Sequence, residues 1–176
     1  MSVNRRWKRR KELTINNMQN RGKQFENVIR NAFERVDGVS IDRLNDNTAG
    51  FKGIAGICDF IVYKEPYEYY IECKSVHGAS LPFINITDTQ WNGLLEKSKI
   101  EGVYAGVICW WINKEKTVFM PIQTLQLMRE VGMKSVRYDA IDDCDGDTDM
   151  IEIKGKKKRV FWEYDMEKFL NELSNM

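Results

Sequence analysis

Two apolar stretches that follow each other closely in the sequence indicate the central part of the fold. Residues 56–63 have the sequence Gly-Ile-Cys-Asp-Phe-Ile-Val-Tyr, and residues 69–74 have the sequence Tyr-Tyr-Ile-Glu-Cys-Lys. Both are rich in β-branched and aromatic residues, and Lys64-Glu65-Pro66 between them is typical of a turn. We therefore predict a β-hairpin with strands at about 57–63 and 68–75.

This hairpin carries three charged residues whose spacing indicates a shared site. Side chains alternate across a strand, so Glu72 and Lys74 are expected on one face while Cys73 points to the other. The turn brings Asp59 near the other two. Two carboxylates beside a lysine can hold a hard divalent cation and place a water against a phosphodiester. The local pattern favours a metal-dependent nuclease.

The same residues resemble the pattern of the PD-(D/E)xK nuclease superfamily. Asp59 stands at the acidic position of the first strand, Glu72-x-Lys74 supplies the second part, and Cys58 replaces the proline. Further residues follow the order found in RecU-type Holliday junction resolvases, and the resemblance covers about residues 20–130. These further residues are Asn20-Arg21-Gly22, Glu26, Asp46, Leu81-Pro82-Phe83 and Gln90.

The resemblance implies a fold, an activity and partners. The fold would be one α/β domain with a mixed central sheet flanked by helices, as in restriction endonucleases. The activity would be structure-selective cleavage of four-way DNA junctions in recombination, with Mg²⁺ as the cofactor and Mn²⁺ as a substitute. The partners would be branched DNA and a second copy of the chain, with no membrane and no small-molecule cofactor. The compact size favours a phage or mobile-element version.

Each site residue has an expected role. Carboxylate oxygens suit Mg²⁺, so Asp59 and Glu72 are the expected metal ligands. Lys74 would orient the attacking water and offset the charge that develops on the phosphate. The resemblance adds Glu26 and Asp46 as further metal-site acids. The alternative for each is an ordinary surface charge, which for Lys74 means a salt bridge.

Gln90 has two competing interpretations. The resemblance makes it a catalytic glutamine on the helix after the hairpin. Thr87-x-x-Gln90 is also a capping box, in which the Gln90 side chain binds the first backbone amide of the helix. We expect one conformation to serve only one of these roles.

The composition fits one soluble domain. The 176 residues are 43% hydrophobic and 30% charged, which is ordinary for a globular protein. No apolar run approaches the ~20 residues that span a bilayer, and residues 1–11 lack the apolar core of a secretory signal. We expect a cytoplasmic protein with a basic, disordered arm at 1–18 and a nuclease domain at 19–176.

The cysteines and the single His77 do not have the spacing of a zinc site. Cys58, Cys73 and Cys109 lie in strand-like stretches, where a free cysteine usually behaves as a small buried hydrophobic residue. A reducing compartment follows from this pattern. We expect His77 to be a solvated loop residue.

The net charge of +1 hides strong segregation along the chain. Residues 139–152 hold seven acids and no base, and residues 154–159 hold five bases. An EF-hand alignment of the acidic stretch puts Ile141 at the first ligand position, so we expect an acidic loop and no calcium site. The N-terminal bases are expected to contact DNA phosphates together with Arg21, and Trp7 could stack on a base. These bases are Arg5, Arg6, Lys8, Arg9, Arg10 and Lys11.

Hydrophobic periodicity predicts the remaining elements. Helices are expected from residue 20 to 36, from 87, from 121 and from 165, with Asn20, Thr87 and Asp165 as caps. Strands are expected at 39–41, 103–111, 117–120, 134–138 and 150–154, with loops at 42–56 and 76–86. The stretch 103–111 and the aromatic residues near Trp162 are candidate dimer surfaces, although burial in the single expected core suits the former better.

Two alternatives remain open at this stage. The chain could be a restriction-like or repair endonuclease that acts on ordinary or damaged duplex DNA. It could also be a non-catalytic DNA-binding accessory protein of recombination. The joint presence of Glu26, Asp59, Glu72 and Lys74 argues against the second alternative, because a protein that only binds DNA has no need of all four.

Overall fold

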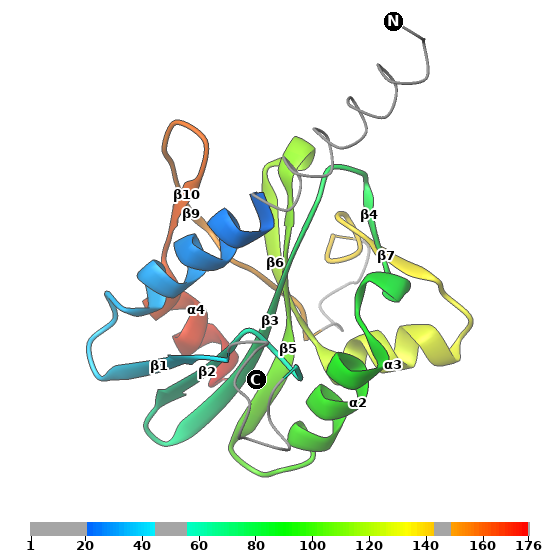
Figure 1. The fold of residues 1–176 in the computed structure, drawn as a ribbon, viewed down its shortest axis with the longest axis horizontal. Helices are drawn as coiled ribbons and strands as arrows, with labels where there is room; N and C mark the ends of the chain where they lie inside the picture. The colour runs from blue at the N-terminus through cyan, green and yellow to red at the C-terminus, as the bar shows by residue number, and fades with distance from the viewer. Residues whose placement is uncertain (1–20, 45–55, 143–148, 176) are drawn as a thin grey trace, which may run out of the picture.

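A six-stranded mixed sheet runs through the middle of the protein, with helices on both of its faces (Figure 1). The computed structural model describes residues 21–44, 56–142 and 149–175. In spatial order the strands are β1 (Val39–Arg43), β2 (Phe60–Lys64), β3 (Tyr67–Val76), β5 (Val103–Trp111), β6 (Lys116–Pro121) and β8 (Ile151–Glu152). The predicted fold class, one α/β domain with a mixed central sheet flanked by helices, is confirmed.

The helices form two layers. The first helix, described over residues 21–33, shares one face of the sheet with α4 (Met166–Leu173). The other face is covered by α2 (Asp88–Lys97) and α3 (Ile122–Glu130) (Figure 1). None of the described helices is both long and apolar enough to cross a membrane.

The predicted hairpin is present as β2 and β3, which pair antiparallel with Phe60 opposite Ile71. The next neighbour of β3 is β5, which runs parallel to it. Parallel neighbours need a crossover connection, and α2 supplies it. Because α2 packs on the face of the sheet that it crosses, its first turn comes to lie against β3.

Alternation along β3 divides the core into two hydrophobic layers. Ile71 and Cys73 are buried under the first helix and α4, whereas Tyr70 is buried on the side of α2 and α3. The single core expected from the sequence is therefore two layers on one sheet, because helices cover both faces of the central strands. The stretch 103–111 is part of this core, with Trp111 only 1% exposed, and does not form a surface.

The expected apolar stripe of the first helix is confirmed. Its members Phe25, Ile29 and Phe33 are buried against the sheet. Glu26 lies beside this stripe and is half-buried. The helix thus fixes a carboxylate at the border between the core and the solvent. The capping position Asn20 lies outside the described residues.

Several elements differ from the sequence-based expectation. The strand predicted at 39–41 continues to Arg43 as β1. The stretch 76–86 is not a plain loop, since it holds β4 (Ser80–Pro82) and the short 3-10 helix η1 (Phe83–Asn85). Strands this short carry too few residues to show alternation. A second 3-10 helix, η2 (Ile112–Lys114), follows β5.

Two small strand pairs lie outside the main sheet. β4 pairs with β7 (Ser135–Arg137), and β9 (Gly155–Lys157) pairs with β10 (Trp162–Tyr164). The second pair forms a hairpin that the sequence did not predict, because its lysine-rich strand lacks apolar residues. The hairpin projects from the side of the sheet that carries the first helix (Figure 1).

Candidate active site

Asp59 is held at the point where β2 begins. Its carbonyl oxygen accepts a hydrogen bond from the amide of Leu44 at 2.9 Å, and its own amide donates to the carbonyl oxygen of Ile71 at 3.1 Å. Its side chain is fixed as well, because Oδ2 accepts a hydrogen bond of 2.8 Å from the amide of Cys73. Neighbouring strands on both sides therefore set the position of this carboxylate.

Glu72 lies in β3 and is almost completely buried, with 2% of its surface exposed. Continuing the β2–β3 register by one step beyond Phe60 and Ile71 places Asp59 opposite Glu72. The Oε1 atom of Glu72 lies 2.6 Å from Nζ of Lys74. Its Oε2 atom is buried and has no hydrogen-bond partner among the described residues. A buried carboxylate oxygen without a partner is costly, so it marks a place where a ligand would stabilise the protein.

Gln90 on the first turn of α2 binds both charged residues of β3. Its Nε2 donates a 2.7 Å hydrogen bond to Oε1 of Glu72, and its Oε1 accepts one of 3.3 Å from Nζ of Lys74. The same Oε1 accepts a 3.0 Å hydrogen bond from the amide of Thr87, which completes the capping box. One conformation of Gln90 thus makes the capping contact and the contacts with Glu72 and Lys74 together, because the two ends of an amide bond different partners and the oxygen has two lone pairs.

Burial and mutual repulsion disfavour the charged forms of both carboxylates. Burial raises the pKa of Glu72 to about 8, and the negative charge of Asp59 adds to this effect. Burial also raises the pKa of Asp59 to about 6, although the hydrogen bond from the Cys73 amide acts in the opposite direction. Added positive charge between them would favour ionisation of both.

Glu26 and Arg43 complete the charged cluster. The Glu26 carboxylate raises the pKa of Asp59, and Arg43, which forms an ion pair with Glu26, lowers it. Arg43 was not predicted as a site residue. Its signal was the alternation of Val39, Ile41 and Arg43, which continues the strand by two residues and turns Arg43 toward the first helix.

The donor set suits a magnesium-type cation. Within residues 21–44, 56–142 and 149–175, no three His, Cys, Asp or Glu side chains group closely enough to enclose a metal ion. Mg²⁺ does not need such an enclosure, since it keeps several waters and takes one or two carboxylates plus substrate phosphates. Asp59 and Glu72 offer this pair, and the unpartnered Oε2 of Glu72 is a free ligand atom.

The other predicted site residues are divided between described and undescribed parts of the chain. Arg21 begins the described part of the first helix and is half-buried, and His77 is exposed. Cys58, Cys73 and Cys109 are free and buried, and burial raises the pKa of each thiol, so none is a reactive thiolate. The residues that lie outside the described ranges are Arg5, Arg6, Trp7, Lys8, Arg9, Arg10, Lys11, Asp46 and residues 143–148.

Comparison with solved structures shows a similarity in fold. No protein-family model and no curated protein sequence matches this chain. Among solved structures, the chain is similar to Hjc, a Holliday junction resolvase from the archaeal hyperthermophile Archaeoglobus fulgidus. The similarity covers 58% of this chain and 74% of that chain, with 20% sequence identity and a TM-score of 0.42. At this level of similarity, function has to be argued from the residues of the site.

Proposed function

We propose that this chain is a metal-dependent DNA endonuclease of the restriction-endonuclease-like class. The observation that supports this is the arrangement around Glu72, a buried carboxylate that faces Asp59, binds Lys74 and Gln90, and keeps one oxygen free. A purely structural role would leave no reason to bury a carboxylate oxygen without a partner. The raised pKa values of Asp59 and Glu72 are typical of functional sites.

The residues divide the chemistry between them. Asp59 and Glu72 would hold Mg²⁺, or Mn²⁺ in its place, which supplies positive charge at the scissile phosphate. Lys74 reaches the surface of the site with 20% of its side chain exposed, so it can orient the attacking water and stabilise the charge that develops in the transition state. Gln90 fixes the Glu72 carboxylate, and Glu26 can position a second water.

The proposed substrate is branched DNA. The support is the order of Asn20-Arg21-Gly22, Asp59, Glu72-x-Lys74 and Gln90, which resembles RecU-type junction resolvases. Resolution of a four-way junction needs two cuts in strands of like polarity, so we propose a symmetric homodimer with one site in each copy. The arm at 1–18 would add phosphate contacts to the domain at 19–176, and the buried free cysteines suit the cytoplasm.

Nicking assays test the proposal directly. The protein is incubated with a labelled four-way junction, a linear duplex of the same sequence and a single strand, each with Mg²⁺ or with EDTA. We expect the junction to be cleaved in the reactions with Mg²⁺ and not in those with EDTA, with paired nicks in two strands of like polarity. Preferential cleavage of the linear duplex would assign the site to an ordinary duplex nuclease, and cleavage in excess EDTA would reject the metal mechanism.

Sedimentation of the free and the junction-bound protein tests the assembly. A dimer on the junction is the expected result. A monomer on the junction, or nicks confined to one strand, would contradict a resolvase.

A further inference from the structure

The β9–β10 hairpin presents the most basic surface segment of the described chain. Its two strands pair with Trp162 opposite Lys157, and the five bases at 154–159 lie directly before β9, in β9 and in the turn that follows it. The turn residues Lys158, Arg159 and Val160 are all exposed. The hairpin projects beside the sheet, with its turn at the outer end of the two strands (Figure 1). The site described above does not use it.

The turn of the hairpin is fixed to the sheet near the candidate active site through Phe161, the last residue before β10. The ring of Phe161 lies 5.5 Å from that of Trp110 in β5, and Trp110 is paired with Ser75, the residue after Lys74. Trp110 also stacks on Phe25, the neighbour of Glu26 on the first helix, at 5.6 Å. Aromatic contacts therefore link the hairpin to residues that adjoin two members of the candidate site.

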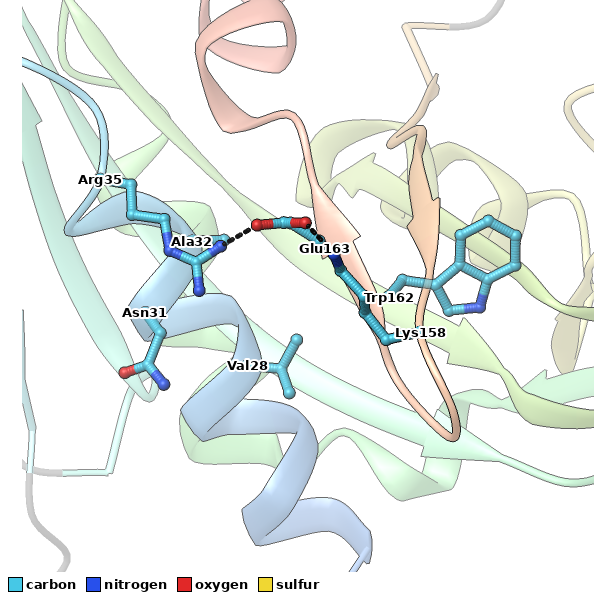
Figure 2. A pocket seen from close by; sticks show the side chains of 7 residues that line it. All are labelled: Val28, Asn31, Ala32, Arg35, Lys158, Trp162 and Glu163. Atoms are coloured by element: carbon cyan, nitrogen blue, oxygen red, sulfur yellow. Dashed lines mark hydrogen bonds and ion pairs between the residues drawn. The ribbon is translucent and has the colours of Figure 1, made fainter.

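Ion pairs connect one side of the hairpin to the turn that follows the first helix. Figure 2 shows Glu163 between Arg35, two residues after the end of that helix, and Lys158, at 2.9 and 2.8 Å. Lys157 pairs with Glu115 beyond the end of β5. One carboxylate shared by two cations leaves this junction positive. The hairpin is thus held by contacts on two sides while its charge is only partly neutralised.

Two cations of the hairpin remain available for a partner. Lys156 and Arg159 are exposed, and neither forms an ion pair with any residue of the described ranges. Holding like charges together on a small protruding element costs free energy in the isolated protein, and a polyanion would recover it. The regular negative charge of a phosphodiester backbone matches a row of exposed lysines and arginines.

We propose that the β9–β10 hairpin is a DNA-binding element that contacts the phosphate backbone of the substrate beside the active site. This inference rests on the proposed nuclease function and identifies a second DNA contact in addition to the basic arm. Lys156 and Arg159 bind phosphate oxygens, and the ion pairs of Glu163 keep the hairpin in place while they do so. The hairpin takes no part in bond cleavage.

The salt dependence of DNA binding tests the proposal. The full chain is titrated with a fluorescent four-way junction in EDTA, at several salt concentrations, as wild type and as the Lys156→Gln/Arg159→Gln double variant. Loss of two phosphate contacts should lower the slope of log affinity against log salt by about 1.8, because each contact contributes about 0.9. The affinity ratio between the two proteins should therefore change about tenfold between 50 and 200 mM salt.

Two control variants isolate the hairpin charge. The first control, Lys64→Gln/Lys99→Gln, also removes two positive charges, but far from the hairpin. Lys64 pairs with Tyr67 at the start of β3, and Lys99 lies shortly before β5, which runs parallel to β3. Val160→Ser alters the hairpin turn without changing charge. Both controls should keep the wild-type slope, and circular dichroism should show that all variants are folded.

The outcomes separate the hairpin from the nuclease proposal. If the wild type binds the junction and the double variant shows the same slope of log affinity against log salt, the hairpin contact is overturned and the nuclease proposal stays intact. A wild-type protein that binds no DNA removes the basis of both. If the double substitution changes self-association but not the salt dependence of DNA binding, the basic hairpin contacts another copy of the chain, and the proposal is overturned. A lowered slope confined to the double variant supports it.

Discussion

Gln90 donates a 2.7 Å hydrogen bond from Nε2 to Oε1 of Glu72, so the start of α2 is tied directly to the most buried acid of the sheet. The hydrogen bond fixes the rotamer of Glu72 and directs its second oxygen, Oε2, to a place without a protein partner. The capping box holds Gln90 in turn. Helix capping and site geometry are thereby coupled through one side chain.

Substitution of Gln90 by Glu should separate these two roles. Glutamate also forms a capping box, so α2 should remain intact. The new carboxylate would face Oε1 of Glu72 and replace an attractive hydrogen bond by repulsion, and we expect cleavage to fall by about tenfold or more. The measurement is the single-turnover rate together with thermal unfolding.

The matched control is Thr87→Ala, which removes the cap but leaves the Gln90 amide. It should cost about 1 kcal/mol of stability and little activity. Equal activity of Gln90→Glu and the wild type would mean that the contact with Glu72 is only structural.

Asp59→Asn should abolish cleavage and leave the fold nearly unchanged. The asparagine oxygen can still accept the hydrogen bond from the Cys73 amide, while the negative charge that a cation needs is gone. Cleavage is measured at saturating Mg²⁺, with Asp42→Asn, an exposed carboxylate of β1, as the control. Substantial cleavage by Asp59→Asn would exclude Asp59 as a required ligand.

Lys74→Ala should lower the cleavage rate by about 10²–10³ while junction affinity stays close to the wild type. The physical reason is that a group which stabilises the transition state affects the rate more than ground-state binding. Binding in EDTA and single-turnover cleavage in Mg²⁺ are compared, with Lys64→Ala as the control. Parallel losses of binding and rate would make Lys74 a phosphate anchor.

Deletion of residues 1–11 should weaken DNA binding and flatten its salt dependence. Up to six cations of this segment can release counterions from DNA, each contributing about 0.9 to the slope. The slope of log affinity against log salt is measured for the deleted and the full chain. An unchanged slope would remove the arm from the DNA-binding surface.

The sequence predicts those elements that show regular alternation, a long apolar stretch or a helix-capping motif. The hairpin around Asp59 and Glu72, the buried stretch 103–111 and the cap of α2 at Thr87 were all recognisable, because alternation, apolar length and capping boxes are local signals. The caps at Thr87 and Asp165 accept backbone hydrogen bonds as predicted, from Gln90 and Lys168. Local chemistry sufficed for these features.

Other features depend on packing between distant segments. Arg43 meets Glu26 only because β1 lies beneath the first helix, and Gln90 reaches Glu72 only because α2 crosses over β3. The β9–β10 hairpin is held by Phe161 on Trp110, a contact that a lysine-rich sequence does not reveal. Local propensity carries no information on such contacts, which tertiary packing determines.

Glu72→Gln should stabilise the metal-free protein at alkaline pH while abolishing cleavage. The pKa of Glu72 is about 8 in the folded protein against an ordinary value of 4.5, chiefly because of burial. A raised pKa in the folded state gives stability that is fully present below pH 4.5 and is lost as the pH rises through about 8. Glutamine cannot ionise, so the variant should not show this loss.

Thermal unfolding in EDTA between about pH 5 and pH 9 measures this difference, with the stability advantage of Glu72→Gln expected to grow across the window. Added Mg²⁺ should raise the unfolding temperature of the wild type near pH 8 but not that of the variant, because only the wild type offers the carboxylate pair. A wild type that gains stability relative to Glu72→Gln as the pH rises would show that Lys74 and Gln90 already outweigh the burial of the charge. The unpartnered Oε2 atom of Glu72 would then no longer support a cation site.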